Sequence, residues 1–182
     1  MAEWSGVARR IRVPLGFAFA VLYFWLARPT WRFLVLGAVL IVPGLLIRAV
    51  ASGHVRKNEA LATSGPYAYT RNPLYLGSLL TGLGFAVASR SWWVVVVLVA
   101  MFFAIYVPVI RAEENFLREK FPEFGEYARR VPRMFPRIGA SSEGGRSFSF
   151  DLYWQHREYN ALLGAVGMMA ALVAKMILTK KN

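Results

Sequence analysis

The sequence predicts an all-α integral membrane protein, a polytopic bundle of about five transmembrane helices. Of its 182 residues, 57% are hydrophobic, above the roughly 45–50% typical of soluble domains, and the mean hydropathy is +0.41. The apolar residues gather in long runs separated by charged segments. Runs of about 20 apolar residues span the hydrocarbon core of a bilayer as helices.

Five apolar segments support this count. The third begins with Pro73, which suits the first turn of a helix, and the second contains Pro43 and Gly44, where we expect a kink. The first segment is short and ends near Trp25, a residue too bulky for a signal-peptide cleavage site, so it is interpreted as an uncleaved span. The segments are Val13–Ala27, Phe33–Val50, Pro73–Ala88, Trp92–Ile110 and Tyr159–Leu178.

The charge distribution predicts the topology. The net charge is +12, and the Lys and Arg residues are concentrated in the N-terminus, the second loop and the long fourth loop. The positive-inside rule places these segments in the cytoplasm. We therefore expect an integral protein of a bacterial or archaeal cytoplasmic membrane, with its active site on the cytoplasmic side. Because the basic residues lie between apolar runs, they are interpreted as charges that set the topology and contact lipid headgroups, rather than as a nucleic-acid site.

The chain is interpreted as one domain, 1–182. Residues 1–53 hold the first two spans, 54–136 the cofactor-binding and catalytic core, 137–158 a linker rich in Gly and Ser over its first part, and 159–182 the last span. The absence of cysteine excludes disulfides and thiolate chemistry. With only two histidines, no metal site is expected.

The segment Gly65–Gly77 is the most informative stretch of the chain. It places Arg71 in a proline-bent, aromatic loop at the head of the third span. A cation near lipid costs free energy unless it is paired or wetted, and a bound anionic or zwitterionic ligand could supply the pairing.

Two further patterns allow alternative interpretations. Gly77, Thr81, Gly84 and Ala88 form one narrow face of the third span, which suits either close helix packing or a groove for a flat cofactor. In the groove interpretation, Gly84→Leu blocks cofactor binding without unfolding the protein.

The second pattern is the adjacent pair Glu113 and Glu114. In one interpretation these are ordinary interfacial charges, with Glu114 paired to Arg118 one helical turn later. In the other they serve a site. The following aromatic and basic stretch, 121–136, is typical of an interfacial membrane anchor.

The order of these motifs resembles the integral-membrane superfamily of isoprenylcysteine carboxyl methyltransferases and phospholipid N-methyltransferases. The resemblance covers about His54 to Pro136. The family's Arg-His-Pro-x-Tyr-x-Gly motif is matched except that Asn72 replaces the histidine, and its Phe-Gly-x-Glu-Tyr stretch is altered. The matching residues are His54, Gly65-Pro66-Tyr67, Arg71, Pro73, Tyr75, Gly77, Gly82, Gly84, Glu113, Glu114, Phe121, Tyr127 and Val131-Pro132.

The resemblance implies S-adenosylmethionine as methyl donor, with S-adenosylhomocysteine as product. The donor's carboxylate needs a cation such as Arg71 or His54, and its ammonium and ribose hydroxyls need Glu113 and Glu114. The resemblance implies Arg71, Glu113 and Tyr75 as catalytic residues. It implies as cofactor-binding residues His54, Gly65, Pro66, Tyr67, Asn72, Pro73, Gly77, Gly82, Gly84, Glu113 and Glu114.

The expected function is methylation of a lipidic or isoprenoid acceptor that enters from the bilayer, on a carboxyl oxygen or an amine nitrogen. A membrane sterol-type reductase that uses NAD(P)H shares part of the motif and is one alternative. A non-enzymatic helical membrane protein is another. The residues do not decide between the two acceptor types or specify an oligomeric state.

Overall fold

The computed structural model describes residues 14, 16–57, 59–137 and 147–181. This part of the chain is helical and contains no strand, which confirms the predicted all-α class. The basic cluster at 9–12 and most of the Gly- and Ser-rich linker lie outside the described residues. The helices are a first apolar helix Gly16–Leu26, then α2 Trp31–Ser52, α3 Pro73–Ser89, α4 Trp92–Met101, α5 Val107–Lys120, α6 Phe124–Arg130, α7 Phe150–Gln155 and α8 Tyr159–Lys181.

Within the described residues, three helical stretches are long and apolar enough to cross a membrane: Trp31–Ser52, Trp92–Lys120 and Tyr159–Lys180. Gly16–Leu26 and Pro73–Ser89 are apolar and shorter. The protein is therefore a polytopic helical membrane protein, and each of the five predicted apolar segments contains a helix among its described residues.

The fourth span and the amphipathic helical pattern that follows it in the sequence form one continuous helix. It continues past Ile110 to Lys120, through a π-helical turn, Phe102–Tyr106, that joins α4 to α5. Within that turn the Val107 N–H donates to the Phe102 carbonyl five residues back. Pro108 has no N–H to continue the regular ladder, and the wider turn lets the helix pass this point. Glu113 and Glu114 consequently lie on a helical extension of the span.

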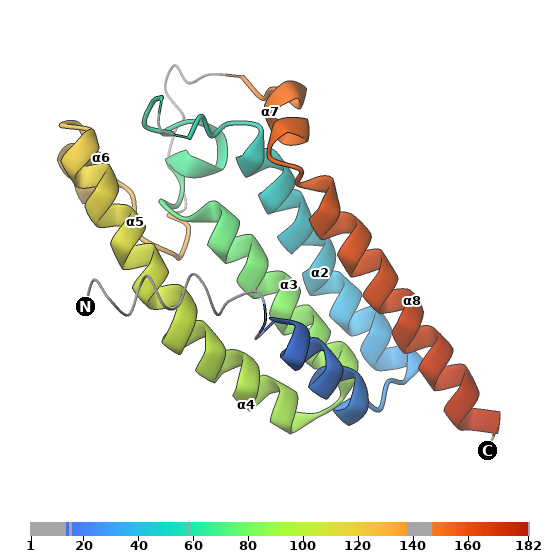
Figure 1. Ribbon diagram of the computed structural model, residues 1–182. Helices are drawn as coiled ribbons and strands as arrows, with labels where there is room; N and C mark the ends of the chain where they lie inside the picture. The colour runs from blue at the N-terminus through green and yellow to red at the C-terminus, as the bar shows by residue number, and fades with distance from the viewer. Residues whose placement is uncertain (1–13, 15, 58, 138–146, 182) are drawn as a thin grey trace.

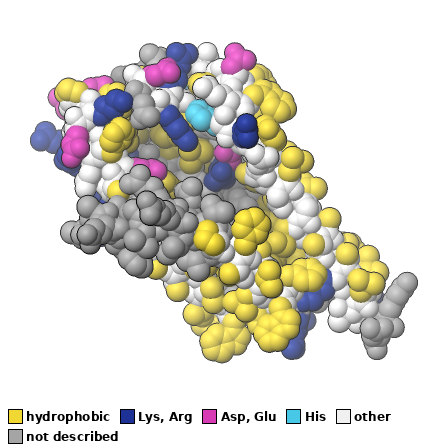
Figure 2. All heavy atoms as spheres, in the orientation of Figure 1, with side chains coloured by type: hydrophobic (Ala, Val, Ile, Leu, Met, Phe, Trp, Pro, Cys, Tyr) yellow, Lys and Arg dark blue, Asp and Glu magenta, His cyan; other side chains and the backbone are white. Residues whose placement is uncertain are grey.

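The helices run between two ends of an elongated bundle (Figure 1). One end carries the loop between α2 and α3, the helix α6 and the helix α7. The other end carries the C-terminus and the short turns before α2 and α4. Charged side chains gather at the first end, and apolar side chains cover much of the helical body (Figure 2).

The helices α2 and α3 approach so closely that their backbones touch. A Cβ atom built on Gly84 would lie 2.6 Å from the Gly37 carbonyl oxygen, and one on Gly77 would lie 2.5 Å from that of Gly44. Glycine is needed at both positions because any side chain would meet backbone. The small-residue face is therefore used for helix packing, and the alternative groove interpretation is wrong for Gly77 and Gly84. Gly82 faces Leu98 on α4 instead.

This packing changes the expected result of substituting Gly84. We expect Gly84→Ala to lower the free energy of unfolding by about 1–3 kcal/mol, the usual cost of overpacking, rather than to block a ligand selectively. Gly164→Ala is the matched control, because a Cβ atom there would meet nothing within 4 Å. Thermal unfolding in detergent compares the two variants, and equal stabilities would contradict the close contact.

Candidate functional site

The loop before α3 is shaped by a tight turn packed against a histidine. Gly65 has a φ of +57°, a backbone conformation that L side chains rarely adopt, and it starts the 3₁₀ turn Gly65–Ala68, with Pro66 in the first turn. A Cβ atom on Gly65 would lie 2.6 Å from Nε2 of His54, whose Nδ1 is 2.8 Å from the Val50 carbonyl oxygen. His54, Gly65 and Pro66 thus shape the loop and do not line its cavity.

A second segment, Val131–Arg137, lies along this loop, and we call it the strap. The Arg71 N–H donates to the Pro132 carbonyl at 2.9 Å, and the Arg137 N–H donates to the Tyr69 carbonyl at 3.0 Å. The Thr70 hydroxyl faces the Arg133 and Met134 carbonyls at 3.2 and 3.0 Å. The strap therefore fixes the loop backbone at Tyr69 and at Arg71.

Just before the strap, α6 contributes Tyr127, which is buried and donates to the Tyr67 carbonyl at 2.8 Å. Burial raises the pKa of the Tyr127 phenol well above its ordinary value, and Arg71 offsets this only in part. Burial likewise raises the pKa of Tyr67. Both phenols are thus neutral at physiological pH, and Tyr127 keeps its hydrogen bond to the loop.

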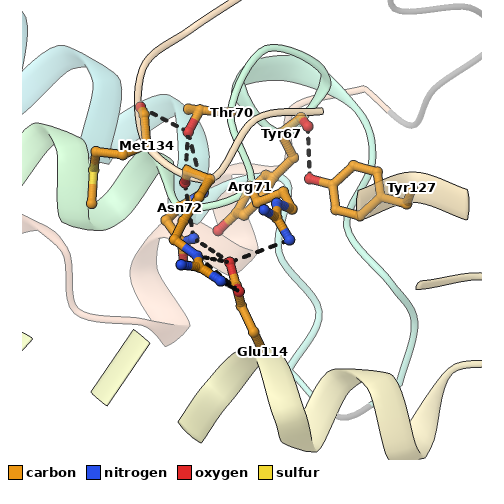
Figure 3. Close-up of polar contacts among 8 residues, drawn as sticks. Tyr67, Thr70, Arg71, Asn72, Glu114, Tyr127 and Met134 are labelled. Atoms are coloured by element: carbon orange, nitrogen blue, oxygen red, sulfur yellow. Dashed lines mark hydrogen bonds and ion pairs between the residues drawn. The ribbon is translucent and has the colours of Figure 1, made fainter. Parts of the chain in front are cut away.

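Glu114 is the centre of the polar contacts. Its side chain extends from α5 toward Arg71 and Asn72 (Figure 3), and Glu114 is only 4% exposed. Asn72 donates through Nδ2 to Glu114 Oε1 at 3.2 Å and to the Arg133 carbonyl at 3.0 Å. The Arg133 guanidinium holds the carboxylate with two nitrogens, Nε to Oε2 at 3.0 Å and Nη2 to Oε2 at 2.8 Å.

These contacts replace the predicted partner of Glu114. The alternative pairing with Arg118, one turn along the same helix, is wrong, since the carboxylate is held by Arg133 and Arg71. The hydrogen bond from Arg133 to Glu114 also raises the pKa of the guanidinium. Glu114 is thus buried and joins α5, the loop and the strap through its contacts.

Arg71 is less well satisfied than its neighbours. Its Nη1 lies 3.5 Å from Glu114 Oε1, and its side chain is 12% exposed. That separation is longer than an N–H···O hydrogen bond, which usually measures about 2.7–3.2 Å between the heavy atoms. Its Nε is buried without a hydrogen-bond partner in the described part of the chain. A buried guanidinium with so few partners is costly, and a bound anion would lower that cost.

Glu113 points to a different neighbour. The Tyr75 hydroxyl donates to Glu113 Oε1 at 2.8 Å. Tyr75 is on the first turn of α3 and Glu113 is on α5, so the pair joins the two helices beside Arg71. The two adjacent glutamates therefore have separate roles, Glu114 inside the protein and Glu113 at an accessible surface.

A cavity of about 290 Å³ lies between the loop and α5. Its lining is mostly apolar and aromatic, and the charged and polar lining residues are Arg56, Lys57, Arg71, Asn72, Glu113 and Glu114. Of the expected site residues, it brings together Tyr67, Arg71, Asn72, Pro73, Tyr75, Glu113 and Glu114, whereas Gly77, Gly82 and Gly84 do not line it.

A second, more polar cavity of about 500 Å³ adjoins the first. Tyr75 and Glu113 line both cavities, as do Val55, Lys57 and Leu74. Its far wall carries an ion pair between α2 and the segment before α8, with Arg48 Nε 2.6 Å from Glu158 Oε1. Arg48 also donates to the Ser78 hydroxyl. Polar pairs inside apolar helices are costly and usually functional.

Two of these groups were not singled out by the sequence. Arg133 lies in a basic stretch that suits a membrane anchor, and nothing in local spacing relates it to Glu114. Arg48 had one usable signal, since it is a charge inside an apolar span. In the described residues, no three His, Asp or Glu side chains gather as metal ligands.

The fold and the site define a class of protein: an integral membrane helical protein with a small-molecule cavity at one end, between the head of α3 and the charged extension of a long span. The family model described as phospholipid methyltransferase matches residues 33–123, half of the chain. The protein belongs to this family.

Two curated relatives resemble the chain over 83 residues, 46% of its length. The cobalt-zinc-cadmium resistance protein CzcN of Cupriavidus metallidurans is 51% identical there, and the match covers 38% of that protein. The nickel-cobalt-cadmium resistance protein NccN of Alcaligenes xylosoxydans xylosoxydans is 40% identical, with 39% of that protein covered. The match thus spans well under half of either relative. No solved structure matches the chain.

Proposed function

We propose that this protein is a membrane-embedded methyltransferase that uses S-adenosylmethionine and modifies a lipidic or isoprenoid acceptor. The observation that carries the proposal is the pair of adjoining cavities with Tyr75 and Glu113 in their common wall. Transfer between two bound molecules requires two sites that meet, and these cavities meet at groups able to orient a reacting atom.

The residues of the first cavity fit the methyl donor. Arg71 offers an under-satisfied cation to a carboxylate, and Glu113 offers a carboxylate to an ammonium or hydroxyl group. Tyr67, Phe124 and Tyr127 line the cavity and offer apolar, aromatic surface to adenine. The volume of about 290 Å³ is near the lower end of small-molecule sites, about 300–1,000 Å³.

When bound, S-adenosylmethionine supplies a methyl group already activated on a sulfonium sulfur. The protein's tasks are therefore to position the acceptor, exclude water and, where the acceptor is an amine, accept a proton. Glu113 is the group placed for that proton, because it is accessible and held by Tyr75. A carboxylate acceptor is ionised at neutral pH and needs no base.

The second cavity suits the polar end of the acceptor. Arg48, Lys57 and His156 line it together with Glu113 and Glu158. The cavity therefore offers basic hydrogen-bond donors and carboxylate acceptors between the helices. An apolar chain attached to that polar end would extend into the bilayer. We place this site on the cytoplasmic side from the Lys and Arg distribution. Because the chain has no native cysteine, single cysteines at Glu123 and Ser91 can test the sidedness by labelling.

Ligand-induced stabilisation tests the proposed donor. We expect S-adenosylhomocysteine to raise the unfolding temperature of the purified protein in detergent, because a ligand at a hundredfold excess over Kd adds about 2.7 kcal/mol of stability. Reduced nicotinamide cofactor should give no shift. The reverse result would favour the reductase alternative, and no shift with either would favour a non-enzymatic protein. Transfer of label from the donor to membrane lipid, followed by mass spectrometry, then identifies the acceptor.

A further inference from the structure

Two arginines share one buried carboxylate at the site, and they share it unequally. Arg133 contacts Glu114 with two nitrogens, at distances of 2.8–3.1 Å. Arg71 contacts it with one nitrogen at 3.5 Å. The stronger partner comes from the surface, since the Arg133 side chain is 50% exposed. The weaker partner lines the cavity.

This inequality has an electrostatic consequence. A buried carboxylate must be paired, and removal of its main partner leaves an uncompensated charge in the interior. With Arg133 in place, its guanidinium largely neutralises the Glu114 carboxylate, so the attraction between that carboxylate and Arg71 is weak. Without Arg133, Asn72 and Arg71 would be the remaining partners seen for Glu114, and the carboxylate would draw the Arg71 guanidinium into a close, two-pronged pair.

We propose that Arg133 is a positioning residue that keeps the Arg71 guanidinium available to the carboxylate of a ligand in the first cavity. Arg133 does not line the first cavity and acts on Arg71 through Glu114. The proposal rests on the proposed function, because it takes the ligand of that cavity to carry a carboxylate, as S-adenosylhomocysteine does.

The geometry allows the side chain of Arg133 to be tested apart from the strap. Thr70 and Asn72 contact the Arg133 backbone carbonyl, and Arg71 bonds to the Pro132 carbonyl. These contacts do not use the guanidinium. Arg133→Ala therefore removes the charge and leaves the backbone contacts of the strap in place.

The test measures the affinity for S-adenosylhomocysteine by calorimetry, with the full chain in lipid nanodiscs. We expect Arg133→Ala to weaken binding roughly tenfold, a typical size for coupled neighbours. In a Glu114→Gln background the same substitution should have no further effect, because the charge that captures Arg71 is already gone. Arg129→Ala, which removes an exposed charge on α6, is the matched control and should bind as the wild type does.

A merely structural role gives a different pattern. It would make Arg133→Ala equally harmful in both backgrounds, with lower unfolding temperatures, and that result would overturn the proposal. Wild-type affinity in Arg133→Ala would overturn it too, while leaving the proposed function standing. If the wild-type protein itself does not bind S-adenosylhomocysteine, the proposed function fails and this inference fails with it. Should Arg133→Ala not fold, Arg133→Gln provides the same comparison.

Discussion

Replacing Arg71 with alanine is expected to weaken binding of S-adenosylhomocysteine by roughly 10- to 150-fold, because a hydrogen bond to a charged group contributes about 1.5–3 kcal/mol. Arg71→Lys should be nearly as damaging. It keeps the charge, but a single ammonium cannot reproduce the planar, forked donors of a guanidinium. Calorimetric titration measures both affinities, and methyl transfer from labelled donor should fall with them.

The fold should survive these changes, because Arg133 still holds Glu114 and the strap still holds the backbone of the loop. Arg111→Ala is the matched control, since Arg111 is exposed on the same span as Glu114 and does not line either cavity. Full affinity and activity in Arg71→Ala would show that this arginine serves packing alone and that the site is elsewhere.

Replacing Glu113 with glutamine is expected to have the second large effect. The amide keeps the shape of the carboxylate and can still accept the Tyr75 hydroxyl, but it has lost the charge. If the acceptor is an amine, turnover should fall by about 10²–10⁴, the usual contribution of general acid–base catalysis. If the acceptor is a carboxylate, the loss should appear instead in donor affinity.

Measuring affinity and turnover of Glu113→Gln separately distinguishes these cases. A variant that binds S-adenosylhomocysteine tightly and does not turn over identifies Glu113 as a base and the acceptor as an amine. Tyr75→Phe should produce a smaller effect in the same direction, because it frees Glu113 without removing it. A Glu113→Gln variant with unchanged affinity and turnover would remove Glu113 from the site.

The helices of this fold could be predicted from sequence for a simple physical reason. A long apolar run in a bilayer must satisfy its own backbone, and a helix does so within one segment. The limits of the prediction are equally physical. The fourth apolar span was predicted to end near Ile110, with an amphipathic helical pattern in the basic segment after it, but the pattern did not show that span and amphipathic helix form one continuous helix through α5.

The candidate site was predictable as a set of residues and not as a set of contacts. Arg71, Tyr75, Glu113 and Glu114 all lie together as the ordered motifs indicated. The partner of Glu114 was not predictable. Helical spacing indicates only partners about one turn away in sequence, whereas Arg133 lies in the strap, which the chain reaches after α6. The spacing of Gly77 and Gly84 suited either packing or binding, and the position of α2 decides between them.

The length of α3 has a consequence for the membrane around the protein. Its 17 residues rise about 26 Å, short of the roughly 30 Å hydrocarbon thickness of a typical bilayer. Where α3 crosses the bilayer, local thinning of the lipid, or a position of the helix head below the plane of the headgroups, would relieve this mismatch. Either adjustment shortens the distance between Arg71 and the acyl region. Under the proposed function, an acceptor anchored in the leaflet would then need little vertical displacement to bring its polar end to the second cavity.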